Sequence, residues 1–372
     1  MIGSVLVIGG GVGGMSAAMA MARNGIAVEL VDCDPDWRAY GAGISVTGLS
    51  LRAFDALGIL DEVKSAGYVS SGIRLRAPNG SIVMESPPLP ADLAPIDRSG
   101  GIMRPALHAI MQRHTLAAGV KVTLGVEPSA FADKGDHVEV TLSDGTSRTV
   151  DLVVSADGIF SKTRSMLFAE AGKPKFTGQG CWRIVADRPA SIDRPEIWIG
   201  GPVKVGLNPI SEDKLYAFIL EHVPDNPWYE EEDMLPHVAR LLEPFGGEIA
   251  NIRANLGPDS LVNYRPLEWL LLPKPWHRGR VVIIGDAVHA TTPHLASGAG
   301  AAAEDGLVLA EELARTDNLD AALSAFADRR FERARMIVEN SVRIGEIEMS
   351  GGDQRDANIM LGSTMEKLKE PY

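Results

Sequence analysis

The sequence is poor in cysteine and has no surplus of positive charge. Its two cysteines among 372 residues, Cys33 and Cys181, supply neither a disulfide framework nor the paired spacing of a zinc site. The formal net charge of −13 argues against a nucleic-acid partner or an anionic membrane surface. These absences indicate a reducing compartment, so we expect a cytoplasmic protein that binds no nucleic acid and no metal.

One local concentration of basic residues needs an interpretation of its own. It falls in an expected C-terminal helix where acidic residues are interleaved, an alternation typical of a solvent-exposed face. We therefore interpret it as a solvated helix face, formed by Arg329, Arg330, Arg333 and Arg335.

The chain also lacks the usual pattern of a targeting or membrane segment. Its first charged residue is Arg23, but no basic residues precede the apolar opening, and the glycines at 9–14 interrupt it. We expect no membrane association. With 45% hydrophobic residues, a chain of this length can fill the cores of two domains.

The opening stretch, residues 5–32, reads as a strand, a glycine-rich turn, a helix and a second strand that ends in an acid. Gly9 permits the tight turn, Gly11 lets the backbone approach a pyrophosphate, and Gly14 lets the helix pack closely on the sheet. The helix N-terminus attracts phosphate, and Asp32 can accept hydrogen bonds from a ribose 2′-hydroxyl. This order of elements predicts a dinucleotide-binding unit.

Further along the chain, alternating residues flank Asn79-Gly80 and Asp144-Gly145, which predicts two hairpins. Two more apolar strands end at Asp157 and Asp286. Between residues 178 and 272, strand-like runs surround one helix. We therefore expect an α/β fold in which a Rossmann-like domain carries an inserted, mostly antiparallel β-rich domain and closes with helices near 300–313 and 319–349.

Three stretches, in this order, resemble the single-component (class A) FAD-dependent aromatic hydroxylases, a flavoprotein monooxygenase family. They are the opening fingerprint, SADGIFSKTR (residues 155–164) and GRVVIIGDAVHATTPHLASGAG (residues 279–300). The last stretch is most similar to the urate and salicylate hydroxylase branch. The resemblance implies a discontinuous FAD-binding domain over 1–72, 101–177 and 273–350, a substrate-binding β-sheet domain over 73–100 and 178–272, and a C-terminal tail over 351–372.

The resemblance also implies an activity. NADH or NADPH would reduce FAD, and O2 would then hydroxylate a small phenol-like aromatic or heteroaromatic substrate by way of a flavin C4a-hydroperoxide. Two alternatives stay open: an FAD-dependent dehydrogenase or reductase without oxygen transfer, and a non-catalytic nucleotide-fold protein. We expect a monomer or a homodimer.

The family's FAD contacts match a series of positions here, with one departure. Ala296 stands where the family has glycine, so a positive φ at that position would strain the alanine. The matching positions are Gly9, Gly11, Gly13, Gly14, Asp32, Cys33, Gly43, Arg104, Val126, Asp157, Asp286, Ser297, Gly298, Ala299 and Gly300.

On the substrate side, the resemblance implies that Tyr216 faces the substrate and that the Pro293 carbonyl lies beside the flavin. His294 is a candidate proton carrier or a loop hydrogen-bonding residue. Lys204 stands where the urate hydroxylase branch has an arginine, and a lysine lacks the bidentate fork. Two further residues, Arg183 and His222, could meet a substrate carboxylate or hydroxyl, or could be surface or packing residues.

Overall fold

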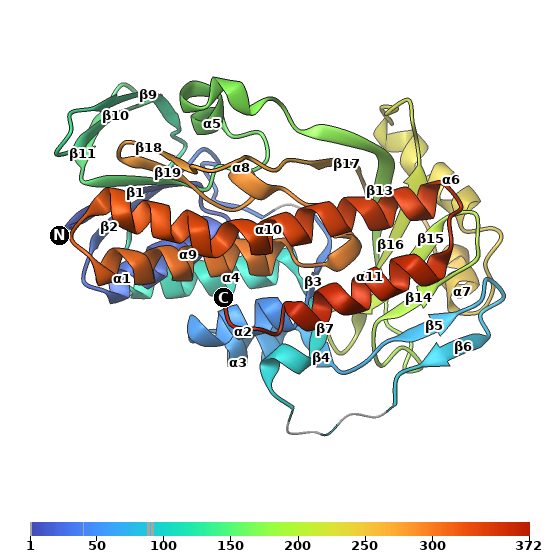
Figure 1. Ribbon diagram of the computed structural model, residues 1–372. Coiled ribbons are helices and arrows are strands. Elements are labelled where there is room, and N and C mark those ends of the chain that lie inside the picture. Colours follow the sequence, from blue (N-terminus) through green and yellow to red (C-terminus); the bar gives the residue numbers. More distant parts are fainter. Residues whose placement is uncertain (1, 40, 88–89, 91–92) are drawn as a thin grey trace.

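The computed structural model describes residues 2–39, 41–87, 90 and 93–372 (Figure 1). Two sheets of different character lie at opposite ends of the molecule, and long C-terminal helices run alongside both (Figure 1).

The first sheet is the parallel sheet that the opening fingerprint predicts. Its apolar strands alternate, so Val7 and Leu30 face a layer of helices whereas Leu6 and Val31 face a small antiparallel sheet. The strand order is β18-β19-β12-β1-β2-β8, with bounds β1 (Ser4–Ile8), β2 (Ala27–Asp32), β8 (Lys121–Leu124), β12 (Leu152–Ser155), β18 (His277–Arg278) and β19 (Val281–Ile283).

Helices cover one face of this sheet and a three-stranded sheet covers the other. Both predicted hairpin turns form. Asp144-Gly145 joins two strands of this three-stranded sheet, and Asn79-Gly80 joins two strands of the second large sheet, described next. The covering elements are α1 (Val12–Arg23), α4 (Arg104–Ala117), α9 (Gly298–Arg315), β9 (Pro128–Asp133), β10 (Val138–Leu142) and β11 (Ser147–Val150).

The second sheet is mostly antiparallel and has seven strands in the order β17-β13-β16-β15-β14-β5-β6. One face of this sheet, which carries Trp182 and Ile219 and which we call the far face, packs on α6 (Glu231–Leu241) and α7 (Glu248–Ala254). The sequence interpretation missed α7. The strands are β5 (Arg74–Arg76), β6 (Ile82–Glu85), β13 (Lys175–Asp187), β14 (Glu196–Trp198), β15 (Lys204–Pro209), β16 (Lys214–His222) and β17 (Val262–Trp269).

The register of β16 decides which side chains face the first sheet. Leu215 and Ile219 enter the core under α6 and α7, so Tyr216 and Phe218 point to the opposite face. Arg183 pairs directly with Phe218, and directly paired residues share a face. We call this surface the inner face of the second sheet.

A third, small sheet bridges the two larger ones. It has the order β3-β7-β4, and helices α2 and α3 follow β3 along the chain. The bounds are β3 (Gly43–Val46), α2 (Gly48–Ala56), α3 (Leu60–Ala66), β4 (Tyr68–Ser70) and β7 (Ser99–Met103). Short helices occur elsewhere in the chain. They are η1 (Pro95–Asp97), α5 (Lys162–Leu167), η2 (Ala169–Ala171), α8 (Asp286–His289) and η3 (Pro293–Leu295).

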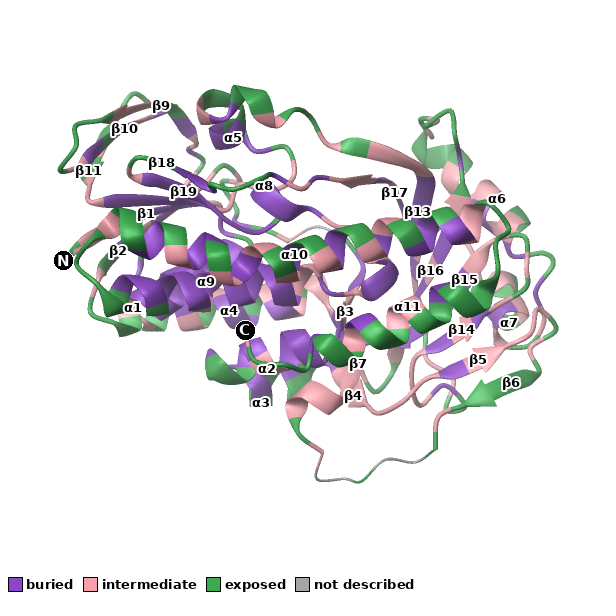
Figure 2. Cartoon of the chain, in the orientation of Figure 1, coloured by how far each residue is buried: buried purple, intermediate pink, exposed green. Residues whose placement is uncertain are grey.

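The C-terminal segment ends in a helix that the sequence interpretation missed. It placed the last helix at 319–349, which is α10 (Leu319–Met349), and treated 351–372 as a tail. Residues Gln354–Lys367 form α11, whose cap residue Asp353 accepts a hydrogen bond from the Arg355 N–H. Helix α9 is buried along most of its length, whereas α10 and α11 each keep an exposed side (Figure 2). Helix α11 thus packs outside α10.

Candidate flavin and substrate site

The glycine-rich turn has two kinds of glycine. A Cβ on Gly14 would collide with the Gly9 carbonyl oxygen, and Gly9 has φ +99°, so these two residues build the turn itself. A Cβ on Gly11, in contrast, would meet nothing within 4 Å. Gly13 lies against Ala302 of α9. The turn is therefore closely packed at Gly9, Gly13 and Gly14 and open at Gly11, where a ligand could approach the protein backbone.

Side chains that the sequence interpretation missed hold this turn in place. The Gly10 carbonyl accepts hydrogen bonds from Trp37 Nε1 and His108 Nε2, each at 3.0 Å. The Gly10 N–H donates to the Asp32 carboxylate at 2.6 Å. No motif marks Trp37 or His108, because the bond depends on a loop and a helix that meet only in three dimensions.

The end of β2 forms the neighbouring wall. Asp32 also accepts from the Asp34 N–H at 2.8 Å, and its own carbonyl accepts from the Val126 N–H at 3.1 Å. Val126 is buried, and Cys33 is exposed beside them. Asp32, Cys33 and Val126 thus lie together at the carboxyl ends of β2 and β8, where ligands of such sheets bind.

Asp157 follows β12 and stands next to the turn. Its carboxylate accepts from Ser155 Oγ at 2.7 Å and from the Thr163 N–H at 3.0 Å, which fastens the start of α5. The buried Arg164 donates to the Ala287 carbonyl at 2.8 Å. The Asp157 and Asp286 motifs, far apart in the sequence, are therefore bonded into one unit.

Asp286 follows β19 and begins the short helix α8. Solvent reaches its side chain, yet the protein around it desolvates the carboxylate and raises its pKa, with His289 and Arg104 partly opposing the rise. Burial likewise lowers the pKa of Arg104, helped by the nearby Arg183. The guanidinium groups of Arg104 and Arg183 make no hydrogen bond or ion pair within the described part of the chain.

A buried ionic network supports the Asp286 turn. Asp305 accepts from the Gly285 N–H at 2.8 Å, from His289 Nε2 at 2.6 Å and from Arg330 Nε at 2.7 Å. Burial would raise the pKa of Asp305, but His289 and Arg330 hold it at about 2. Arg330 also donates to Glu304 at 2.8 Å.

This network corrects the interpretation of the arginine cluster as a solvated face. Arg330 is fully buried, and Arg333 also bonds Glu304, at 2.9 Å. Of the four, only Arg335 is exposed, where it pairs with Glu332 of its own helix, whereas Arg329 is half-buried and pairs with Glu311 and Glu312 of α9. The prediction failed because the acids that pair with this helix come mainly from α9, not from neighbours in the sequence.

The loop before α9 carries the strain that the sequence predicts. Ala296 has φ +48° and ψ +32°, a left-handed conformation that glycine would adopt freely. Ser297 donates its hydroxyl to the Leu295 carbonyl at 2.8 Å instead of capping the helix. The first N–H groups of α9, at Gly298, Ala299 and Gly300, therefore have no side-chain cap and favour negative charge.

Tyr216 stands on the inner face and reaches β3. Its hydroxyl shares a short hydrogen bond with Ser45 Oγ, which also accepts from Asn208 Nδ2 at 2.9 Å. A Cβ on Gly43 would collide with the Tyr216 ring. Gly43 thus makes room for the tyrosine. Sequence reasoning missed Ser45 and Asn208, since neither belongs to a motif.

The other predicted substrate-side residues separate into two groups. Arg183 shares the inner face with Tyr216, whereas His222 is exposed at the end of β16. Lys204 bonds Glu348 of α10 at 2.6 Å, and His294 is buried beside the same glutamate. Pro293 begins η3, directly before His294.

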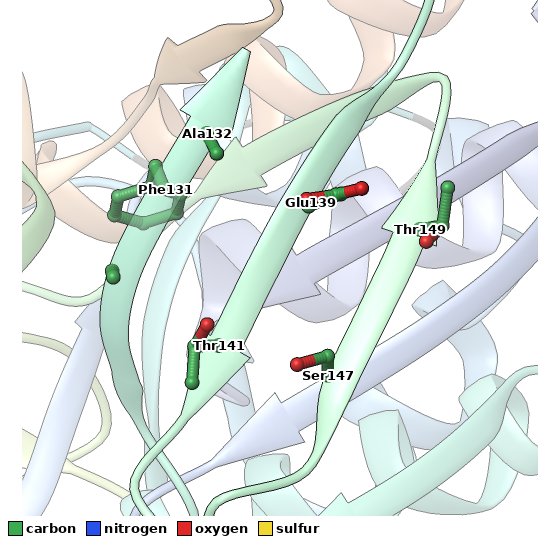
Figure 3. A pocket seen from close by; sticks show the side chains of 7 residues that line it. Phe131, Ala132, Glu139, Thr141, Ser147 and Thr149 are labelled. Carbon is green, nitrogen blue, oxygen red and sulfur yellow. The ribbon is translucent and has the colours of Figure 1, made fainter. Parts of the chain in front are cut away.

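One cavity lies away from all these residues. It occupies the face of the β9-β10-β11 sheet, has a volume of about 320 Å³, and is lined by Ala130, Phe131, Ala132, Glu139, Thr141, Ser147 and Thr149 (Figure 3). Searches of the described residues find no cluster of three or more His, Cys, Asp or Glu suited to a metal ion. Within the same residues, no helix has the length and apolar character needed to cross a membrane.

Together these features fit FAD and define a flavoprotein. The open Gly11, the acids at the strand ends and the uncapped start of α9 face groups that a dinucleotide would supply. The chain belongs to the FAD binding domain family, whose model matches residues 3–341. It is an FAD-dependent monooxygenase of the aromatic-hydroxylase type that takes electrons from NAD(P)H, as the sequence predicted.

Known relatives agree with this assignment over the full length. The chain is 29% identical to the putative FAD-dependent monooxygenase YetM of Bacillus subtilis, over 99% of each chain. It is 32% identical to the 2-heptyl-3-hydroxy-4(1H)-quinolone synthase of Pseudomonas aeruginosa, over 98% of this chain and 94% of that one. The crystal structure of Klebsiella pneumoniae HpxO with FAD and uric acid shares the fold, with a TM-score of 0.83, 23% identity, and coverage of 98% and 96%.

Proposed function

We propose that this monooxygenase hydroxylates a small heteroaromatic ring that carries a phenol-like hydroxyl or oxo group. The observation that carries the proposal is that Tyr216 and Arg183 share the inner face of the second sheet, with the charges of Arg104 and Asp286 close by. Two relatives support the ring type, since one is named for a quinolone product and the other was crystallised with uric acid.

Residues of the first sheet would hold FAD. Gly9, Gly11, Gly13, Gly14 and the start of α1 would take the pyrophosphate, and Asp32 a ribose hydroxyl. Asp286 would bind the ribityl chain. When bound, FAD supplies the reduction of O2 and the transfer of one oxygen atom to the ring. The remaining proposed contacts are Cys33, Gly43, Arg104, Val126, Asp157, Ser297, Gly298, Ala299 and Gly300.

The protein's own groups would orient the ring and manage protons. The Tyr216 hydroxyl, held by Ser45, can accept or return the proton of a phenol-like group. Arg183 would attract its negative charge, and the start of α9 would stabilise negative charge on the cofactor side. Pro293 and His294 would close the site, and His222 would stand at its rim.

Each of the two larger sheets belongs to one proposed domain. We infer an FAD-binding domain of residues 1–72, 101–177 and 273–350 and a substrate domain of 73–100 and 178–272, supported by their separate hydrophobic clusters. A cytoplasmic location and a monomeric or homodimeric state are further proposals, the first supported by two free cysteines.

The test is a screen of phenols, pyridines, quinolones and purines with the FAD-loaded enzyme. Ring hydroxylation requires that one compound accelerates NAD(P)H oxidation and yields hydroxylated product in a 1:1 ratio, with one oxygen atom from labelled O2. Stimulated oxidation that reduces the compound without oxygen incorporation would instead establish the dehydrogenase or reductase alternative.

A further inference from the structure

Lys204 is already occupied by a carboxylate from the C-terminal half of the chain. Its ammonium group lies 2.6 Å from Glu348 Oε1, and the two side chains are 19% and 11% exposed. An ion pair so little exposed is weakly screened by salt. Helix α10 runs from the first sheet to the second (Figure 1), and its last turn carries Glu348 to Lys204 of β15.

A second side chain, His294, lies beside the same carboxylate. His294 Nε2 lies 3.5 Å from Glu348 Oε2, and His294 Nδ1 lies 2.9 Å from Thr292 Oγ1. Burial lowers the pKa of His294, although the neighbouring Glu348 opposes this shift. When Thr292 donates to Nδ1, the ring N–H lies on Nε2, the nitrogen that faces Glu348.

Helix α10 approaches this cluster at a glycine. A Cβ on Gly345 would lie 2.9 Å from Gln179 Oε1 and 3.0 Å from His294 Nε2. Both atoms and Glu348 Oε2 are buried without a hydrogen-bond partner in the described structure. Burial would raise the pKa of Glu348, yet His294 and Lys204 hold it at about 2. Glu348 is therefore an ionised, enclosed partner of Lys204.

Resting on the proposed function, we propose that Glu348 is a positioning residue that withholds the Lys204 charge from the substrate and so biases the site toward uncharged rings. Lysine presents a compact charge that one carboxylate can neutralise, unlike the fork of an arginine. Removing Glu348 would leave Lys204 half-buried and unpaired, and such a cation attracts any available anion.

Two probes of equal shape measure this bias without turnover. Salicylate and salicylamide differ in charge, and each is titrated into FAD-loaded enzyme while the visible flavin spectrum is recorded. The readout is the ratio of the salicylamide Kd to the salicylate Kd. Glu348→Gln should raise this ratio by roughly tenfold, because Lys204 then becomes available to the anion. Glu346→Gln is the matched control, since Glu346 forms an exposed ion pair with Arg343 on the same helix.

Lys204→Gln decides the proposal even where Glu348→Gln does not fold. On its own it should change the ratio by less than about twofold, and in the Glu348→Gln background it should abolish the gain. A large fall of the ratio in Lys204→Gln alone would mean that Lys204 meets the ligand, which would overturn the proposal. An unchanged ratio in folded Glu348→Gln would overturn it too.

If neither probe changes the flavin spectrum, the accessibility of the Lys204 amine is measured by acetic anhydride labelling followed by mass spectrometry. The rate at Lys204, relative to the exposed Lys121, should rise several-fold in Glu348→Gln because the amine loses its carboxylate partner. An equal rate in the two proteins contradicts the proposal. These readouts involve no hydroxylated product, so they stand apart from the outcome of the activity screen.

Discussion

At the scale of single residues, two glycines of one turn predict opposite outcomes. Gly11→Ala places a methyl group in open space, so the protein should fold normally but bind FAD roughly 10- to 100-fold more weakly. Gly14→Ala drives a methyl group into the Gly9 carbonyl and should prevent folding. The flavin-to-protein absorbance ratio after desalting, with circular dichroism, distinguishes the two. Full flavin content in Gly11→Ala would remove this residue from the site.

Tyr216 separates oxygen transfer from cofactor binding. Tyr216→Phe deletes the hydroxyl bonded to Ser45 while the ring still fills the space beside Gly43, so FAD should stay bound. Product formation should fall roughly 10- to 1,000-fold, the range for one orienting or proton-transferring group. NAD(P)H oxidation should fall less, and hydrogen peroxide should account for the difference.

The control for this variant is Tyr229→Phe, because Tyr229 packs edge-to-face on Trp182 at the far face of the same sheet. Oxidised NAD(P)H, peroxide and product are measured together in one assay. Wild-type product per NAD(P)H at the wild-type rate in Tyr216→Phe would move the search to His294, Arg183 and His222.

At the scale of elements, the start of α9 and the long α10 are joined by buried charge. Asp305→Asn leaves Arg330 fully buried with one of its two acidic partners gone, so the free energy of unfolding should fall by about 3–5 kcal/mol. Urea denaturation measures this. Glu311→Gln, which removes a partly exposed partner of Arg329, should change the stability little.

The same pair predicts a pH dependence with a definite sign. The pKa of Asp305 is about 2 in the folded protein and 3.8 ordinarily, so its carboxylate contributes stability above pH 3.8 and loses that contribution as the pH falls toward 2. The stability difference between wild type and Asp305→Asn should therefore shrink as the pH falls from about 5 toward 2. Because Asp305 also raises the pKa of His289, the difference should be largest between about pH 5 and pH 6.5 and should shrink as the pH rises through the raised pKa of His289. A difference that stays constant down to pH 2.5 contradicts the assignment.

At the scale of the whole molecule, cofactor binding should stabilise the fold by mass action. Free FAD at about 100 times its Kd should add about 2.7 kcal/mol to the free energy of unfolding. Asp286→Ala should abolish this gain. It should not lower the stability of the FAD-free protein, because the desolvated carboxylate has no hydrogen bond to lose among the described residues. Thermal unfolding with and without FAD tests both statements, and an undiminished FAD effect in the variant would place Asp286 outside the cofactor site.

Local sequence determined the parts of this protein that depend on neighbours along the chain. The turn at Gly9–Gly14, both hairpins, the strands that lead to Asp157 and Asp286, and helices α9 and α10 follow from periodicity, turn residues and glycine placement. The strain at Ala296 was also foreseeable, since one methyl group suffices to disfavour a positive φ. The order of the three motifs along the chain also indicates the FAD-dependent family without any knowledge of tertiary contacts.

Only the tertiary structure decided which side chains meet. Trp37 and His108 on Gly10, Ser45 on Tyr216, and Glu348 on Lys204 are contacts between elements that lie 27 to 171 positions apart. The buried Arg330 shows the reason most clearly, because its charge looked solvated beside its own helical neighbours. Whether a charge is buried depends on what packs over it, and here that is α9, a separate helix whose acids no local pattern assigns to Arg330.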